Sequence, residues 1–201
     1  GNTRTYKKEN FIVSIVDEKK YETLFLYTNL DKDSIINSSE NELRENIYFV
    51  ISYNEKINLP SIDKVFFELD QTKVYWKSWS YKTTSFKDYN NEILRSAMTL
   101  KLLNFQKTGA IIAAATTSIP ESIGEVRNWD YRFCWIRDAS MVIKVISKIG
   151  HTRMVKNFID FILNIIPDKN EKLQIMYGIS GEKYLNEKTL DYLSGYKNSK
   201  P

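Results

Sequence analysis

Hydrophobic residues in the first part of the chain fall in short runs that are rich in β-branched and aromatic side chains, a composition typical of strands. Turn-forming clusters at 29–34 and 37–39 separate the runs. The pattern predicts strands at Phe11–Val16, Glu22–Tyr27, Ile47–Tyr53 and Lys64–Leu69. Val74–Trp79 closes this β part, which spans residues 1 to about 81. The spacing favours an antiparallel sandwich or meander over alternating strands and helices.

Helical spacing of apolar residues replaces the strand pattern from Asp88 onward. A first helix is predicted with apolar positions up to Leu103, closed by Gly109 after a Gln-Lys-Thr tail. A second is predicted from about Asp138 to Ile149, with Gly150 as its C-terminal stop. Its inward face is predicted to consist of Met141, Val142, Val145, Ile146 and Ile149.

A third helix is predicted to begin at a Thr152 cap and to end at Pro167. Because only a short turn separates it from the second helix, the two are expected to form an antiparallel hairpin. Its inward face is predicted to consist of Met154, Val155, Phe158, Ile159, Ile162, Ile165 and Ile166. The chain is therefore expected to be α+β, with a β-sandwich domain at 1–84 and a helical domain at 85–201.

Composition excludes several classes of site. Hydrophobic residues make up 42% and charged residues 27%, as in ordinary folded proteins. The net charge of +4 is dispersed along the chain, which argues against a nucleic-acid partner. With one cysteine, Cys134, and one histidine, His151, no intrachain disulfide is possible, and we expect no metal and no cofactor. We expect Cys134 to be a buried hydrophobe and His151 to have a loop or capping role.

No apolar run is long enough to cross a membrane, and no signal peptide is recognisable. We therefore expect a cytoplasmic protein without a membrane partner. The sequence does not predict an oligomeric state.

The segment Arg127–Asp138 is the richest in candidate chemistry, with four aromatic residues, three arginines and two aspartates. The C–H face of a sugar ring packs on an aromatic ring, and its hydroxyls need donors and acceptors of fixed direction. The segment could grip a polyhydroxylated ring in this way. The same residues could also form a buried cluster with a purely structural role. Trp129 and Phe133 are expected in the core, and Trp76 and Trp79 between the β domain and the helices.

Several further motifs occur with this segment in a fixed order: two tryptophans three residues apart, then the segments 95–103, 109–121, 127–138, 173–178 and 193–201. In this order they resemble the prokaryotic branch of glycoside hydrolase family 15, the glucoamylases and related trehalases. The match is dense from Trp76 to Pro201, whereas residues 1–70 carry no matching motif. The resemblance implies a β-sandwich followed by an (α/α)6 toroid whose pocket hydrolyses α-glucosidic bonds with inversion.

The resemblance also assigns substrate contacts. Arg137 and Asp138 resemble a pair that hydrogen-bonds the hydroxyls of the glucose released, and Trp135 resembles a pocket wall. Tyr131 resembles a tyrosine near the attacking water, and Asp130 resembles a residue at the pocket's flank. The structural alternative for Arg137 and Asp138 is an ion pair that caps a helix.

No glutamate of this chain matches either catalytic glutamate of the family, so no catalytic residue is assigned here. We expect the general acid and base downstream of residue 201, and the chain to be a hydrolytically inactive front segment that also lacks its natural N-terminal start. Three alternatives stay open: glucoamylase or trehalase specificity, a non-catalytic carbohydrate-binding or regulatory module, and a nucleic-acid-binding protein.

Overall fold

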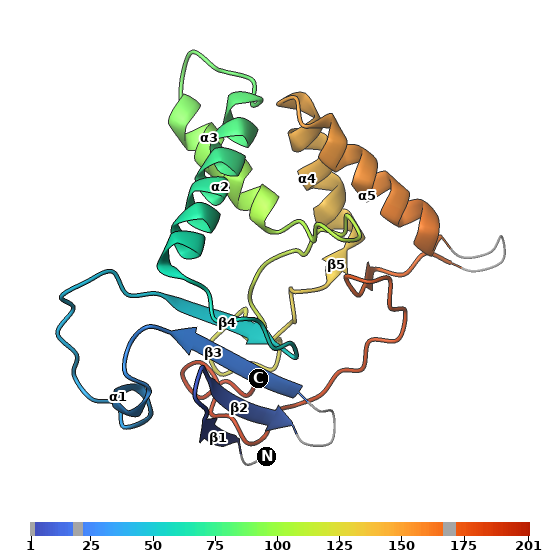
Figure 1. Cartoon of the computed structure of the whole chain (residues 1–201). Helices are drawn as coiled ribbons and strands as arrows, with labels where there is room; N and C mark the ends of the chain where they lie inside the picture. Colours follow the sequence, from blue (N-terminus) through green and yellow to red (C-terminus); the bar gives the residue numbers. More distant parts are fainter. Residues whose placement is uncertain (1–2, 18–21, 167–171) are drawn as a thin grey trace. The chain divides into compact units, whose positions relative to one another are not determined.

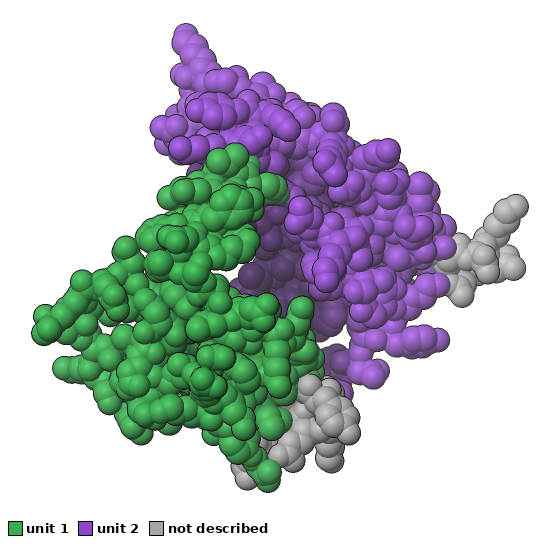
Figure 2. Space-filling model, viewed as in Figure 1, with its two compact units in different colours: residues 1–76 green, residues 77–201 purple. Residues whose placement is uncertain are grey.

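The chain divides into two compact units, residues 1–76 and 77–201 (Figure 2). The computed structural model describes residues 3–17, 22–166 and 172–201. The combination of an antiparallel sheet and helices confirms the α+β prediction. The proposed domains, 1–84 and 85–201, stay predictions.

The first unit contains a four-stranded antiparallel sheet whose strands lie in chain order (Figure 1). Its strands are β1 (Arg4–Lys7), β2 (Ile12–Asp17), β3 (Glu22–Thr28) and β4 (Phe49–Tyr53). The register places Ile12 opposite Leu26, and Leu26 opposite Ile51. The first three predicted strands are confirmed, and β1 is an additional edge strand. A short helix, α1 (Lys32–Ile36), overlaps the first predicted turn region and extends two residues beyond it.

One face of the sheet is buried and carries Phe25 and Tyr27, whose rings contact Phe11. The Tyr27 hydroxyl accepts a hydrogen bond from the backbone N–H of Ile57 at 2.9 Å, which ties the segment after β4 back to the sheet. On β4, alternate residues Phe49, Ile51 and Tyr53 are exposed instead. The described residues of this unit form one sheet, so the sandwich stays a prediction.

The predicted strand Lys64–Leu69 is wrong, and so is the extension of the β part through Val74–Trp79 to about residue 81. Residues 62–81 form helix α2 (Ile62–Tyr81) (Figure 1). Its signals are local. The Ser61 hydroxyl accepts a hydrogen bond from the Lys64 N–H at 3.2 Å, as an N-cap does, and Lys64 pairs with Glu68 one turn later. Valine and phenylalanine favour strands only weakly, and capping with regular i,i+4 spacing outweighs that preference.

In the described part of the second unit, the end of α2 is followed by three helices: α3 (Asn90–Leu102), α4 (Ile136–Lys148) and α5 (Thr152–Ile165). Residues 138–166 contain no strand, as predicted. The core combines the inward side chains of these helices with those of the loop after α3 and of a short strand pair, β5 (Cys134–Trp135) and β6 (Met176–Tyr177). Its buried residues include Ile111, Ile146, Met154, Phe158, Phe161 and Tyr177.

The corner between α4 and α5 is closed by a Schellman motif. The Gly150 N–H donates to the Ser147 carbonyl and the His151 N–H donates to the Ile146 carbonyl, at 3.2 and 3.1 Å. Gly150 has φ +97°, which confirms it as the stop of α4. The cap of α5 is His151 and not Thr152, which is already helical. The predicted stop at Pro167 lies outside the described residues.

The buried faces of α4 and α5 are narrower than the sequence pattern predicts. Ile146 and Phe158 are buried, and Val142 and Ile162 pack against the core. Other positions in the same predictions are exposed, namely Met141, Val145, Ile159 and Ile166. A hairpin of two helices buries only the stripe at their contact, so the flanks of each apolar face stay exposed.

His151 fixes this corner to the last turn of α2. Its ring stacks on the Trp79 indole with centroids 3.8 Å apart, and its Nε2 lies 2.8 Å from the Thr83 hydroxyl. Burial, and then the charges of Lys101 and Lys82, lower the pKa of His151 below its ordinary value. The predicted loop or capping role of His151 is confirmed, and Trp79 packs on the helical core.

Candidate functional site

The segment Arg127–Asp138 runs from a loop through a short strand into a helix. Its strand β5 (Cys134–Trp135) pairs with β6 (Met176–Tyr177), placing Cys134 opposite Tyr177. α4 begins at the next residue, where the Ile136 N–H donates to the Ile175 carbonyl at 3.1 Å. Trp135 is thus the N-cap residue of α4, and Asp138 lies in its first turn.

A stretch of small residues supports the other side of this segment. The Ala113 and Ala114 N–H groups donate to the carbonyls of Phe133 and Tyr131, and the Tyr131 N–H donates to the Thr116 carbonyl, at 2.9–3.1 Å. Cys134 is fully buried, as expected, and burial raises the pKa of its thiol. A backbone held on both sides in this way gives its outward side chains fixed positions.

Arg137 and Asp138 form an ion pair at the start of α4. Arg137 Nη2 and Nε lie 3.1 and 3.2 Å from the same oxygen, Asp138 Oδ2. The Arg137 side chain is 69% exposed and that of Asp138 is 33% exposed. Both groups are therefore open to solvent, and the helix dipole favours the Asp138 charge at this end.

Asp130 and Arg132 form a second, tighter pair. Arg132 Nη2 and Nε donate to the two oxygens of Asp130 at 2.8 and 3.1 Å, and the Arg132 backbone N–H adds a bond of 3.0 Å. Burial raises the pKa of Asp130, but the hydrogen bonds and charge of Arg132 outweigh burial and lower it overall. Asp130 is therefore ionised and already occupied by Arg132.

Tyr131 and Trp135 lie close together, with ring centroids 5.9 Å apart and planes 37° apart. Trp135 Nε1 is buried and has no hydrogen-bond partner among the residues that the structure describes. A buried indole N–H normally has a partner, so this donor is a natural contact for an added polar group. The aromatic pair and the Arg137–Asp138 pair thus flank the same strand-to-helix junction.

The interpretation of Trp129 as a core residue is wrong. Its side chain is 39% exposed, and its Nε1 donates to Glu121 Oε1 at 3.0 Å. Glu121 also faces Arg127, with 3.7 Å between Oε2 and Nη1. A tryptophan at a loop position is equally compatible with burial and exposure, and the sequence gives no signal for this contact with a residue eight positions earlier.

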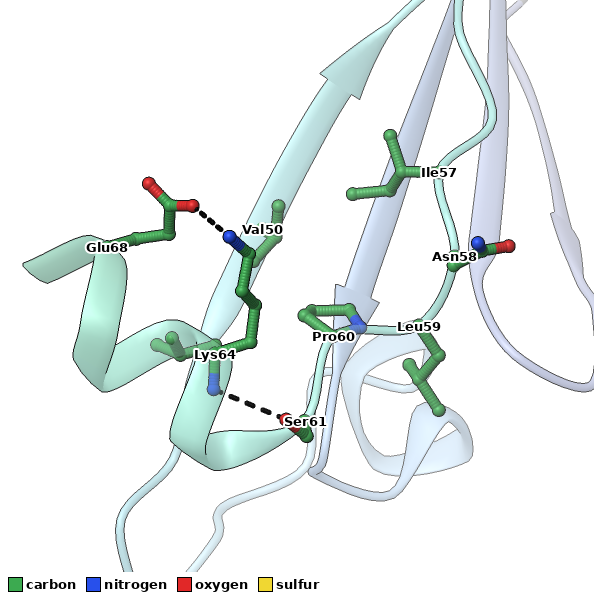
Figure 3. Close-up of a pocket in the computed structure, with 9 residues that line it drawn as sticks. Val50, Ile57, Asn58, Leu59, Pro60, Ser61, Lys64 and Glu68 are labelled. Carbon is green, nitrogen blue, oxygen red and sulfur yellow. Dashed lines mark hydrogen bonds and ion pairs between the residues drawn. The ribbon is translucent and has the colours of Figure 1, made fainter.

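One cavity in each unit lies away from the segment 127–138. A cavity of about 670 Å³ in the first unit lies between β4, the segment after it and the start of α2 (Figure 3). Another, of about 390 Å³, lies between Lys107 and the end of α5. Neither is lined by a residue of the segment 127–138. Within residues 3–17, 22–166 and 172–201 no cluster of three His, Cys, Asp or Glu side chains is arranged to hold a metal ion.

Comparison with known proteins identifies the family. The profile described as "Glycosyl hydrolases family 15" matches residues 87–201, which include the segment 127–138 and all of α3, α4 and α5. The chain belongs to this family. No solved structure matches the chain significantly.

Curated relatives of this family 15 chain include proteins named trehalase. The trehalase of Thermoplasma volcanium is 34% identical over 193 residues, 88% of this chain and 30% of the relative. That of Thermoplasma acidophilum is 37% identical over 142 residues, 71% of this chain and 24% of the relative. That of Mycobacterium tuberculosis is 35% identical over 162 residues, 78% of this chain and 24% of the relative. The chain thus matches between 24% and 30% of the length of these relatives.

Among the helices in the part of the chain that the structure describes, none combines the length and the apolar character that a membrane span requires.

Proposed function

We propose that the protein containing this chain is an inverting α-glucoside hydrolase that acts on trehalose, and that this chain supplies contacts to one glucose ring. Membership of family 15 supports the reaction class, and the trehalases among the relatives support the substrate. The glucoamylase alternative, release of glucose from α-glucans, involves the same ring and bond type.

The observation that carries the proposal is the open Arg137–Asp138 pair at the start of α4. Its carboxylate accepts hydrogen bonds from sugar hydroxyls, and its planar guanidinium donates in a fixed fork. The partner is an uncharged polyol, because the two charges compensate each other. Tyr131 and Trp135 supply ring faces beside the pair, and the Trp135 indole N–H supplies a further donor.

Hydrolysis with inversion needs two carboxyl groups about 6.5–9.5 Å apart, one to protonate the leaving oxygen and one to activate water. The charge of Asp130 is compensated by its ion pair with Arg132, and the Glu121 carboxylate contacts Trp129 and Arg127. The proposal therefore assigns binding and orientation to this chain and both proton transfers to residues outside it. Purified chain 1–201 is expected not to hydrolyse trehalose or maltose.

The test is hydrolysis by the full-length protein of trehalose and of maltooligosaccharides, followed by proton NMR. Inversion at one α-linked carbon of trehalose releases one β-glucose, while the other ring leaves as α-glucose, so early time points should contain equal amounts. Release of α-glucose alone would contradict inversion. Preference for maltooligosaccharides would favour the glucoamylase alternative, and saccharide binding without hydrolysis would favour a non-catalytic module.

A further inference from the structure

Trp129, Glu121 and Arg127 form a constellation that the assigned contacts do not use. The Trp129 indole has one polar atom, Nε1, and Glu121 accepts its hydrogen bond at 3.0 Å. With that edge occupied, the 39% of Trp129 that stays exposed is mainly aromatic carbon. The carboxylate of Glu121 and the guanidinium of Arg127 lie at the rim of this surface, with 47% and 70% of their side chains exposed.

The loop 121–127, which Trp129 follows, is held at its base and at its tip. The Glu121 N–H donates to the Arg127 carbonyl at 3.2 Å and closes the loop at its base. At the tip, the Gly124 N–H donates to the Ser199 hydroxyl at 2.8 Å, and just beyond the base the Asn128 side chain donates to the Lys200 carbonyl. An exposed tryptophan that directly follows such a fixed loop is pre-organised, so binding there loses little conformational entropy.

We infer that Trp129, with Glu121 and Arg127 at its edge, forms a second sugar-binding platform that holds the glucose ring beyond the scissile bond. A ring C–H face packs on the exposed indole, while the carboxylate accepts and the guanidinium donates hydrogen bonds to the hydroxyls at the ring's edge. This inference rests on the proposed function, because the first ring is the one bound by Arg137 and Asp138.

The position of Trp129 suits this role. It is two residues from Tyr131, so their Cα atoms are at most about 7 Å apart. Tyr131 in turn contacts Trp135 at the start of α4. The aromatic residues at 129, 131 and 135 therefore follow one another along a single supported segment that leads to the Arg137–Asp138 pair.

The experiment compares two substrates in the full-length protein: trehalose, whose leaving group is a second glucose, and α-glucosyl fluoride, whose leaving group has no ring to pack on an indole. We expect Trp129→Ala to raise KM for trehalose about tenfold, in the range of a lost aromatic contact, with little change in kcat. The fluoride should be hydrolysed by this variant as by wild type. Trp129→Phe, which keeps a ring but lacks the N–H, should restore most of the affinity for trehalose.

A merely structural role gives a different pattern. If the Nε1–Glu121 bond only fixes the loop, Trp129→Phe and Trp129→Ala will lower the melting temperature by equal amounts. Each variant will then change the kinetics of both substrates to the same extent. Val126→Ala, in the same loop and 91% exposed, is the control. Equal effects on the two substrates, or an unchanged KM for trehalose in Trp129→Ala, would overturn the inference.

A binding readout separates this inference from the proposed function. The Trp129 indole N–H resonance, assigned with Trp129→Phe, is followed during titration with trehalose. If the full-length protein does not hydrolyse trehalose but this resonance shifts, the platform stands and the proposed reaction fails. If hydrolysis occurs while the resonance stays unchanged at saturation, the platform fails and the reaction stands. If the protein neither hydrolyses trehalose nor shows a shift, both fail.

Discussion

At the residue scale, the two Arg–Asp pairs differ in how fully each carboxylate is used. Arg132 engages both oxygens of Asp130, whereas Arg137 contacts one oxygen of Asp138. Among the described residues, no hydrogen bond to the other Asp138 oxygen is found, so Asp138 has room for a ligand. Both oxygens of Asp130, the flanking residue of the resemblance, are engaged by Arg132, and its contact with substrate stays a prediction.

Asp138→Asn is expected to lower kcat/KM of the full-length protein at least about tenfold, roughly 1.4 kcal/mol of transition-state stabilisation. The amide keeps the size of the side chain but loses the charge and replaces one acceptor with a donor. Arg137→Lys should also lower kcat/KM, because an ammonium cannot reproduce the planar fork. Kinetics and thermal unfolding are measured together, with Asp160→Asn on the exposed side of α5 as the control.

A helix-capping role for this pair predicts the opposite order of effects. Loss of a stabilising charge in the first turn lowers stability by about 0.3–1 kcal/mol and leaves kinetics unchanged. Full activity with a lowered melting temperature in both variants would reject the substrate-binding assignment.

Stability should fall as the medium becomes acidic, because His151 is the sole histidine and its folded pKa lies below the ordinary 6.5. The unfolded chain takes up this proton first, so the stabilisation is complete above pH 6.5 and is lost as pH falls through the folded pKa. Protonation would add a third charge beside Lys82 and Lys101.

Urea unfolding of chain 1–201 between about pH 7.5 and 5, above most carboxylate titrations, measures this effect. His151→Asn keeps a favourable N-cap residue but cannot titrate here, and it should flatten the pH dependence. An equal slope in the variant would show that His151 is not the group responsible.

At the scale of elements, the α4–α5 corner depends on one backbone conformation. Gly150 has φ +97°, and a Cβ there would lie 3.2 Å from the Lys82 carbonyl oxygen. Gly124 also has a positive φ, +86°, but a Cβ at that position would meet no atom within 4 Å. The two glycines therefore separate backbone strain from steric contact.

Gly150→Ala is expected to destabilise the chain by about 1–2 kcal/mol from the left-handed conformation alone, and by more where the Lys82 carbonyl cannot move. Gly124→Ala should show only the first contribution. Chemical denaturation of both variants checks this order. Equal losses would mean that the contact with Lys82 relaxes freely.

At the scale of the whole molecule, the exposed apolar side chains of α4 and α5 are the surface of chain 1–201 most prone to self-association. Met141 and Leu163 are each 63% exposed, and Val145, Ile159 and Ile166 are each 48% exposed. By contrast, Ile146 and Phe158 on the same helices are buried in the core, and Val142 and Ile162 pack against it. Exposed apolar surface of this extent favours association.

We expect chain 1–201 to self-associate with rising concentration, as measured by analytical ultracentrifugation. Met141→Lys with Leu163→Lys should reduce association without loss of helix content, because both side chains point away from the core. Ile146→Lys, at a buried position, should unfold the unit instead. A monodisperse wild-type chain with a cooperative melt at high temperature would contradict this prediction.

The sequence alone determined the features that depend on neighbouring residues. Short runs of β-branched and aromatic residues set β2, β3 and β4, and the helical period with Gly150 set α4 and α5. The motif order identified the family and drew attention to Arg137 and Asp138. These properties follow from backbone sterics and local patterning, which a linear sequence contains.

Only the tertiary structure decided which surfaces meet. The pairing of Glu121 with Trp129, the stacking of His151 on Trp79, and the burial of Val142 rather than Met141 depend on contacts between distant segments or on a shared interface. Residues 62–81 show the limit most clearly, because strand-forming side chains there lie on a helix fixed by its cap and i,i+4 contacts. Preferences of single residues are worth less than about 1 kcal/mol, so capping and packing decide such cases.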